Sequence, residues 1–272
     1  MAKIGTSIDL KYQPGFKPIA LFCLALLYTP ILILVLFSFN SGNLIMRWEG
    51  VSLHWYGTAL SNADFFAAAK NTLIISLSAT VIATTVATLA AVGMTRVKPW
   101  PGLGAAFMVV NLPLMVPEII TAVASLSFFA LLAGVFGLNF GIGNLILVHS
   151  VFCTPFAFMP IRARLQDMDL TLEHAAADLY ATPLKAFQRI TFPLLVPGIV
   201  SGAALAFIVS FDDFTITQLV AGPGQTTLPL FIWDQIRRPM TPEINAISAI
   251  LLMVSILFIV LSFLVAQRKQ SQ

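Results

Sequence analysis

Residues 72–94 read TLIISLSATVIATTVATLAAVGM, a run with no charged side chain, bounded by Lys70 and Arg96. A transmembrane helix needs about 20 consecutive, mostly apolar residues. This stretch therefore predicts a helix that crosses a lipid bilayer. Other uncharged runs of similar length lie on both sides of it, so the same reasoning extends to most of the chain.

The composition of all 272 residues supports a membrane protein. Hydrophobic residues make up 58% of the chain and charged residues 10%, with a mean hydropathy of +0.91. Soluble domains carry about 25% charged residues, so this chain cannot cover a water-exposed surface, and a soluble enzyme of ordinary type is excluded. The 22 Phe and the long aliphatic runs also exclude a disordered chain.

The uncharged stretches predict an all-α membrane protein with six transmembrane helices in one transmembrane domain, 1–272. Glycines between Gly134 and Gly143, followed by Asn144, predict the turn that divides the long stretch after Lys98 into two spans. The first run is longer than the 7–15-residue core typical of a secretion signal, so it is interpreted as a retained span. The predicted spans are about 18–39, 72–94, 103–132, 144–161, 194–214 and 244–266.

The distribution of Lys and Arg predicts the orientation. With the N-terminus inside, the inner side carries Lys3, Lys11, Lys17, Arg96, Lys98, Arg162, Arg164, Lys185, Arg189, Arg268 and Lys269. The outer side carries Arg47, Lys70, Arg237 and Arg238. Because basic residues accumulate in cytoplasmic loops, both termini and the loop 162–193 are predicted to be cytoplasmic.

The loop 162–193 is predicted to form two short helices that project from the membrane. Asp169 and Thr171 are residue types that cap a helix N-terminus, and Glu173 in the first turn suits the helix dipole. Thr182 and Pro183 then predict the start of a second helix. Such a loop suits a membrane subunit that receives movement from a soluble motor.

The residues of this loop resemble the EAA loop of ABC importer permeases. The matching positions are Glu173, His174, Ala175, Ala176, Tyr180, Ile190 and Pro193. His174 stands where the family pattern has Glu, Tyr180 stands where it has Gly, and Phe192 stands where it has Leu. The resemblance implies that these residues couple the permease to an ATP-hydrolysing subunit. Tyr180 puts the sharp turn of the pattern in doubt.

Two further runs resemble the permeases of polyamine (spermidine/putrescine) importers, namely SFDD at 210–213 and GPGQTTLP at 222–229. The resemblance implies a bacterial inner-membrane subunit that forms half of a polyamine pathway with a second, homologous permease. It also implies two ATP-binding subunits, an external substrate-binding protein, contact with lipid, no nucleic acid and no cofactor in this chain. The chain has no G-x-x-x-x-G-K-[ST] motif for nucleotide, so ATP is expected on the partner subunits and no catalytic site is expected here.

Three acidic residues inside predicted spans are the candidate substrate path: Glu118, Asp212 and Asp213. A charge at the bilayer centre costs about 2.5–3.5 kcal/mol on insertion scales, and such residues usually face a cavity or a partner. At 1.5 Å per residue, Glu118 and Asp212 lie at a similar depth, about 22 Å from the inner ends of their spans. They could offer ion pairs to a cationic solute. Alternatively, they pair with Arg237, Arg238 or a partner subunit, or lie at the outer interface.

Three other functions remain open alternatives. The same fold could import another small cationic or neutral solute. An intramembrane enzyme is suggested by His149 beside Ser150, but neighbouring side chains on a helix point about 100° apart, so His149 is expected to pack or to hydrogen-bond between helices. A self-sufficient secondary carrier would show inverted repeats with broken helices. Cys23 and Cys153 lie in apolar runs and the three His have no ligand spacing, so neither a disulfide nor a metal site is expected.

Overall fold

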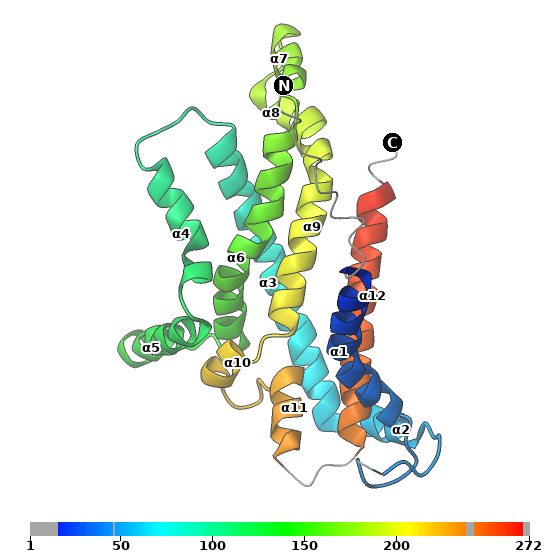
Figure 1. Cartoon of the computed structure of the whole chain (residues 1–272). Helices are drawn as coiled ribbons and strands as arrows, with labels where there is room; N and C mark the ends of the chain where they lie inside the picture. Colours follow the sequence, from blue (N-terminus) through cyan, green and yellow to red (C-terminus); the bar gives the residue numbers. More distant parts are fainter. Residues whose placement is uncertain (1–15, 46, 238–241, 269–272) are drawn as a thin grey trace, which may run out of the picture. The chain divides into compact units, whose positions relative to one another are not determined.

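The computed structural model describes residues 16–45, 47–237 and 242–268, which are largely helical (Figure 1). Within these residues β-type pairing is limited to an isolated antiparallel bridge between Asn40 and Val51. The chain divides into two compact units, 1–59 with 239–250 and 60–238 with 251–272. Lys3, Lys11, Arg238 and Lys269, which entered the predicted orientation, lie outside the described residues.

The first unit contains α1 (Phe16–Phe37) and most of α2 (His54–Ser61), joined by a folded connection. The indole Nε1 of buried Trp55 donates to the carbonyl of Gly42 at 3.1 Å. The hydroxyls of Tyr56 and Ser38 lie 2.6 Å apart and share a hydrogen bond. These contacts fold the segment after α1 back onto α2.

The second unit is built on α3 (Ala63–Thr95), α6 (Ile142–Asp167) and α9 (Phe192–Phe211), which pack side by side (Figure 1). Gly198 and Gly202 on α9 allow a close approach to α6. A Cβ on Gly202 would lie 2.7 Å from the Ala157 carbonyl oxygen, and one on Gly198 would lie 2.7 Å from Cβ of Arg164. Small residues four apart are the usual means by which membrane helices approach closely.

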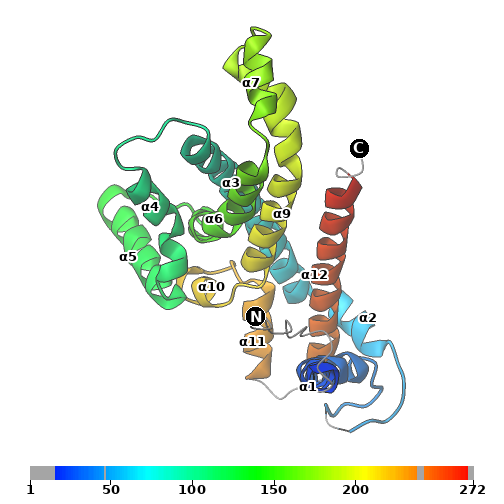
Figure 2. The ribbon, with the colours of Figure 1, turned by 45° about the horizontal axis from the view of Figure 1, so that its top comes forward.

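The predicted span 103–132 is two helices rather than one, α4 (Leu103–Met115) and α5 (Glu118–Phe136). Val116 and Pro117 between them are extended, with ψ of 131° and 136°. The physical reason is Pro117, because a residue before proline avoids the helical region and proline has no N–H to continue the helix. Figures 1 and 2 show α5 turned away from the direction of α4. Glu118 is thus the first residue of α5 and not a mid-span residue.

The predicted loop helices are α7 (Thr171–Asp178) and α8 (Pro183–Ala186), which lie beyond the ends of α6 and α9 in Figure 1. The Thr182 hydroxyl accepts from the Lys185 amide at 3.4 Å, so Thr182 caps α8 as predicted. The second helix is not separate from the predicted span that begins near 194, however. It continues through a π-helical turn, η2 (Phe187–Thr191), directly into α9.

Three helices complete the described chain: α10 (Thr215–Val220), α11 (Leu228–Ile236) and α12 (Glu243–Arg268). By length and apolar composition, five of the described helical segments are long enough to cross a membrane. They are Lys17–Phe37, Ala63–Thr95, Glu118–Phe136, Ile142–Asp167 and Pro183–Phe211. The exact set of six spans stays a prediction.

Candidate functional site

The three predicted path residues line one cavity in the second unit. Glu118 begins α5, Asp212 ends α9 and Asp213 follows it, and all three border a space of about 440 Å³. The aromatic side chains that also line it are Phe152, Phe156 and Phe214. Two interruptions of helical structure, one before α5 and one between α9 and α10, therefore bring carboxylates distant in sequence to one place.

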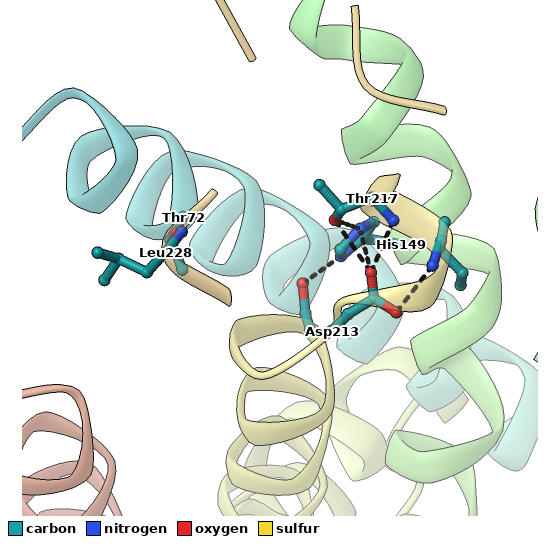
Figure 3. Close-up of polar contacts among 7 residues, drawn as sticks. Thr72, His149, Asp213, Thr217 and Leu228 are labelled. Atoms are coloured by element: carbon teal, nitrogen blue, oxygen red, sulfur yellow. Dashed lines mark hydrogen bonds and ion pairs between the residues drawn. The ribbon is translucent and has the colours of Figure 1, made fainter. Parts of the chain in front are cut away.

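The Asp213 carboxylate is occupied by hydrogen bonds within the protein. It is only 8% exposed, and its Oδ2 accepts from the backbone amide and the hydroxyl of Thr217 at 2.9 and 3.0 Å. Its Oδ1 accepts from the Ile216 amide at 3.3 Å. Figure 3 shows Thr217 and His149 converging on this carboxylate. Asp213 thus holds the N-terminal amides of α10, where a negative charge is favourable.

His149 joins α6 to the segment that carries the acids. Its Nδ1 lies 2.8 Å from the Ser210 hydroxyl, and its Nε2 lies 3.3 Å from the Thr217 hydroxyl and 3.5 Å from Asp213 Oδ2. The prediction of an interhelical hydrogen bond for His149 is confirmed. Ser150 donates instead to the Ile146 carbonyl at 2.6 Å, so these adjacent residues have separate partners.

Glu118 and Asp212 differ from Asp213 because both side chains are exposed. The described part of the chain offers them no basic partner. Arg237, one of the predicted alternatives, stacks its guanidinium over Trp233 at 5.1 Å from the ring centroid. The cavity therefore contains two accessible carboxylates beside one structural carboxylate, a distinction that the sequence pattern did not reveal.

Sequence reasoning also missed two residues that fix the 222–229 segment. Asn71 Nδ2 donates to the carbonyls of Gly224 and Thr226 at 2.9 and 3.0 Å. The Thr72 hydroxyl accepts from the Leu228 amide at 2.8 Å (Figure 3). The sequence offered little indication of this role, because it shows only two polar residues at one end of an apolar run.

Among the predicted coupling residues, Glu173 faces the protein. Its Oε1 accepts from Arg96 Nε at 2.9 Å and from the Thr191 hydroxyl at 3.0 Å. Ala176 is buried within the loop, and Ile190 is only partly exposed. The exposed members of the set are His174, Ala175, Tyr180 and Pro193.

Tyr180 forms the sharp turn that its side chain had put in doubt. Its φ is 59°, the left-handed region that glycine enters without cost, and its side chain is 96% exposed. The turn geometry of the family pattern is thus kept with a non-glycine residue.

Earlier in the loop, the backbone amide of Thr171, and then its hydroxyl, form hydrogen bonds to the Asp169 carboxylate. These hydrogen bonds lower the pKa of that carboxyl.

The chain matches known transport proteins. A family model described as "binding-protein-dependent transport system inner membrane component" matches residues 83–268. The chain belongs to this family. As an inner membrane component of this kind, it is a multi-pass transport subunit rather than an enzyme, and it serves a transport system that uses a substrate-binding protein.

Two curated relatives of this inner membrane component come from Escherichia coli strain K12. The putrescine transport system permease protein PotI is 39% identical over 228 residues, which is 83% of this chain and 81% of that protein. The spermidine/putrescine transport system permease protein PotC is 33% identical over 249 residues, covering 90% of this chain and 91% of that one.

Solved structures support the fold of this inner membrane component. A bacterial ABC transporter that imports alginate has a chain with a TM-score of 0.74 at 18% identity, covering 92% of this chain and 93% of that one. The MetNI methionine ABC transporter in an inward-facing conformation gives 0.61 at 16% identity, covering 73% and 93%. At these identities the similarity concerns the fold alone.

Proposed function

We propose that this inner membrane component is a permease subunit of an ATP-driven importer of polyamines such as putrescine and spermidine. It would form half of the pathway, with a second homologous permease supplying the other half. Two ATP-binding subunits would act from the cytoplasm, on the side of loop 162–193 and both termini, and a substrate-binding protein would deliver the solute from outside. The names of the relatives support the substrate class.

The observation that carries the substrate proposal is the pairing of accessible carboxylates with phenyl rings in one cavity. A polyamine consists of ammonium groups joined by methylene chains. Glu118 and Asp212 can each form an ion pair with an ammonium group that leaves water. Phe152, Phe156 and Phe214 offer faces for the methylenes and for cation–π contact.

A second cavity in the same unit suits a charged solute poorly. It has about 540 Å³ and is bounded by α4, α5 and α6, but apart from Thr121 and Ser125 its lining is apolar. A cation there would lose its hydration without a compensating charge. The acidic cavity is therefore the better place for a polyamine, even though it is the smaller one.

The coupling proposal is that the exposed face of the loop contacts an ATP-binding subunit. His174, Ala175, Tyr180 and Pro193 are the exposed matched positions. Replacing Ala175 with Arg should therefore disturb this contact while leaving the loop folded. The same replacement at Ala176 would disrupt the loop itself, because that side chain is buried.

The test is uptake of radiolabelled putrescine and spermidine by cells that carry single variants. Glu118→Gln and Asp212→Asn each remove one accessible charge, which contributes about 1.5–3 kcal/mol when hydrogen-bonded to a charged partner. Uptake at low substrate should therefore fall by about tenfold or more, since 1.4 kcal/mol corresponds to a factor of ten. Asp64→Asn, an exposed carboxylate in the first turn of α3 that belongs neither to this cavity nor to loop 162–193, is the matched control and should transport normally.

Protein amounts must be equal in all strains, as measured by immunoblot. If both cavity variants take up polyamine like the unsubstituted protein, the acidic cavity is not the path. If an uncharged solute of the same length competes as well as putrescine, the alternative of a neutral substrate replaces the polyamine proposal.

A further inference from the structure

We infer that Arg96, Glu173 and Thr191 form a clasp that makes the loop helix α7 move as one body with the adjoining ends of α3 and α6. Glu173 is then a positioning residue for coupling and not a residue that touches the ATP-binding subunit. The inference rests on the proposed function, in which loop 162–193 receives movement from that subunit. It assigns to Glu173 a role opposite to the one implied by the family resemblance.

The geometry of the clasp joins four elements. Arg96, just after α3, directs Nε to Glu173 Oε1 at 2.9 Å and Nη2 to the Leu165 carbonyl of α6 at 2.8 Å. Thr191, at the end of η2, donates its hydroxyl to the same Glu173 oxygen at 3.0 Å. One guanidinium and one carboxylate thus connect α3, α6, α7 and η2.

The surroundings make this pair stronger than an ordinary surface ion pair. The side chains of Arg96 and Glu173 are 14% and 23% exposed, so water screens their attraction little. By contrast, the Arg47–Glu49 pair has a distance of 3.5 Å with side chains 74% and 43% exposed. Exposed pairs of that kind contribute little.

Packing beside the clasp is incomplete, so these polar contacts are needed to restrain the movement of α7. A cavity of about 410 Å³ lies beside the pair, with Val92 of α3 and Phe187 of η2 on part of its lining. The loop contributes small residues to the rest, Ala177, Ala181 and Ala186, with Pro183. Small side chains beside an empty space give few dispersion contacts across it. A directional, charge-assisted contact is therefore what fixes the angle of α7 against α3.

The chain on either side of α7 is a short connection. Buried Met168 is anchored in the core, so Asp169 and Leu170 are the exposed residues that link α7 to α6, and the turn at Tyr180 links it to α8. Without the clasp, a force applied to the exposed face of α7 would bend these connections. With the clasp, the force reaches α3, the helix that also holds the 222–229 segment through Asn71 and Thr72.

The experiment uses the complete transporter with its binding protein and ATP-binding subunits, reconstituted in proteoliposomes. Arg96→Gln and Glu173→Gln should leave the complex assembled and ATP hydrolysis active, but should lower the polyamine taken up per ATP hydrolysed about tenfold, equivalent to 1.4 kcal/mol. Thr191→Val, which removes one hydrogen bond at nearly constant volume, should lower the ratio less. Lys98→Gln is the control, because it removes an exposed positive charge from the segment between α3 and α4, close to Arg96 in the sequence.

A double variant separates a pair from two independent residues. If Arg96 and Glu173 act through each other, the Arg96→Gln/Glu173→Gln double variant should be no worse than either single variant. Unchanged uptake per ATP in the single variants would overturn the inference. Loss of assembly in all three clasp variants, including Thr191→Val, would also overturn it, because the residues would then serve only to fold the loop.

A second measurement tests the clasp itself without relying on polyamine transport. Amide hydrogen exchange of α7 in the purified complex should become at least several-fold faster in Glu173→Gln, while exchange in the centre of α9 stays unchanged. Equal exchange of α7 in the variant and the unsubstituted protein would overturn the clasp even if transport is normal. Failure of the unsubstituted complex to take up polyamine would instead contradict the proposed substrate and leave the exchange result to decide the clasp.

Discussion

Asp213→Asn should destabilise the protein, whereas Asp212→Asn should not. The substitution at 213 replaces one carboxylate oxygen by an amide nitrogen, which donates and cannot accept. If the remaining oxygen serves Thr217, the new nitrogen faces the Ile216 amide, so two donors oppose each other where a 3.3 Å hydrogen bond had been. The contact of Oδ2 with His149 Nε2, 3.5 Å away, is changed as well.

The magnitude follows from the burial of this group. Leaving one buried donor without an acceptor costs about 1–3 kcal/mol. At 1.4 kcal/mol per factor of ten, the ratio of folded to unfolded protein should fall about 5-fold to 150-fold. Asp212 is exposed and its carboxylate is not part of this network, so its substitution should leave stability within about 0.5 kcal/mol.

The assay is thermal unfolding of the detergent-solubilised transporter, followed by the amount of intact complex that survives heating. Asp213→Asn should lower the midpoint clearly and Asp212→Asn should not, while polyamine uptake per folded molecule should fall for Asp212→Asn. The opposite assignment, with Asp213→Asn stable but transport-deficient, would refute the division between structural and accessible carboxylates.

Three further results are expected. Tyr180→Gly should raise thermal stability, because a non-glycine residue in the left-handed region costs about 1–2 kcal/mol; an unchanged or lower midpoint would contradict the strained turn. Gly202→Val should lower stability by about 1–3 kcal/mol through overpacking against the α6 backbone, measured in the same thermal assay, and a neutral effect would mean that α6 and α9 are not in close contact. The orientation can be tested in a background with exposed Cys23 replaced by Ser. A cysteine introduced at exposed Lys185 should react with a membrane-impermeant thiol reagent only after the membrane is opened, whereas one introduced at exposed Pro223 should react in cells with a permeable outer envelope. The reverse pattern would overturn the predicted orientation.

The sequence predicted the helical fold well where a single physical rule acts alone. Uncharged runs of about 20 residues locate α1, α3, α6 and α9, because burial in lipid depends mainly on local composition. The same rule failed at Pro117, where apolar residues continue across a break in the backbone. Composition reports whether a residue suits lipid, but the path of the backbone depends on hydrogen bonding and on proline.

The candidate site was predicted less completely, for a different reason. The three acids were identifiable because charge is rare in apolar runs, and the structure brings them to one cavity. Their different roles depend on His149 and Thr217, which approach Asp213 only through tertiary packing. Likewise, the inward orientation of Glu173 depends on Arg96, 77 positions earlier in the chain, a relation that no local pattern contains.

The π-helical turn η2 makes the number of residues in the loop as important as their identity. In this turn the Phe192 amide donates to the Phe187 carbonyl, five positions back, so the turn holds one more residue than an α-helical turn. Deleting one residue from 187–191 would restore a regular helix. The preceding part of the loop, α7 and α8, would then be rotated by about 100° around the axis of α9. Glu173 would then swing away from Arg96 although neither residue had changed. Sequence alignments of relatives that keep this Arg–Glu pair should therefore contain no single-residue gap between Thr182 and Phe192.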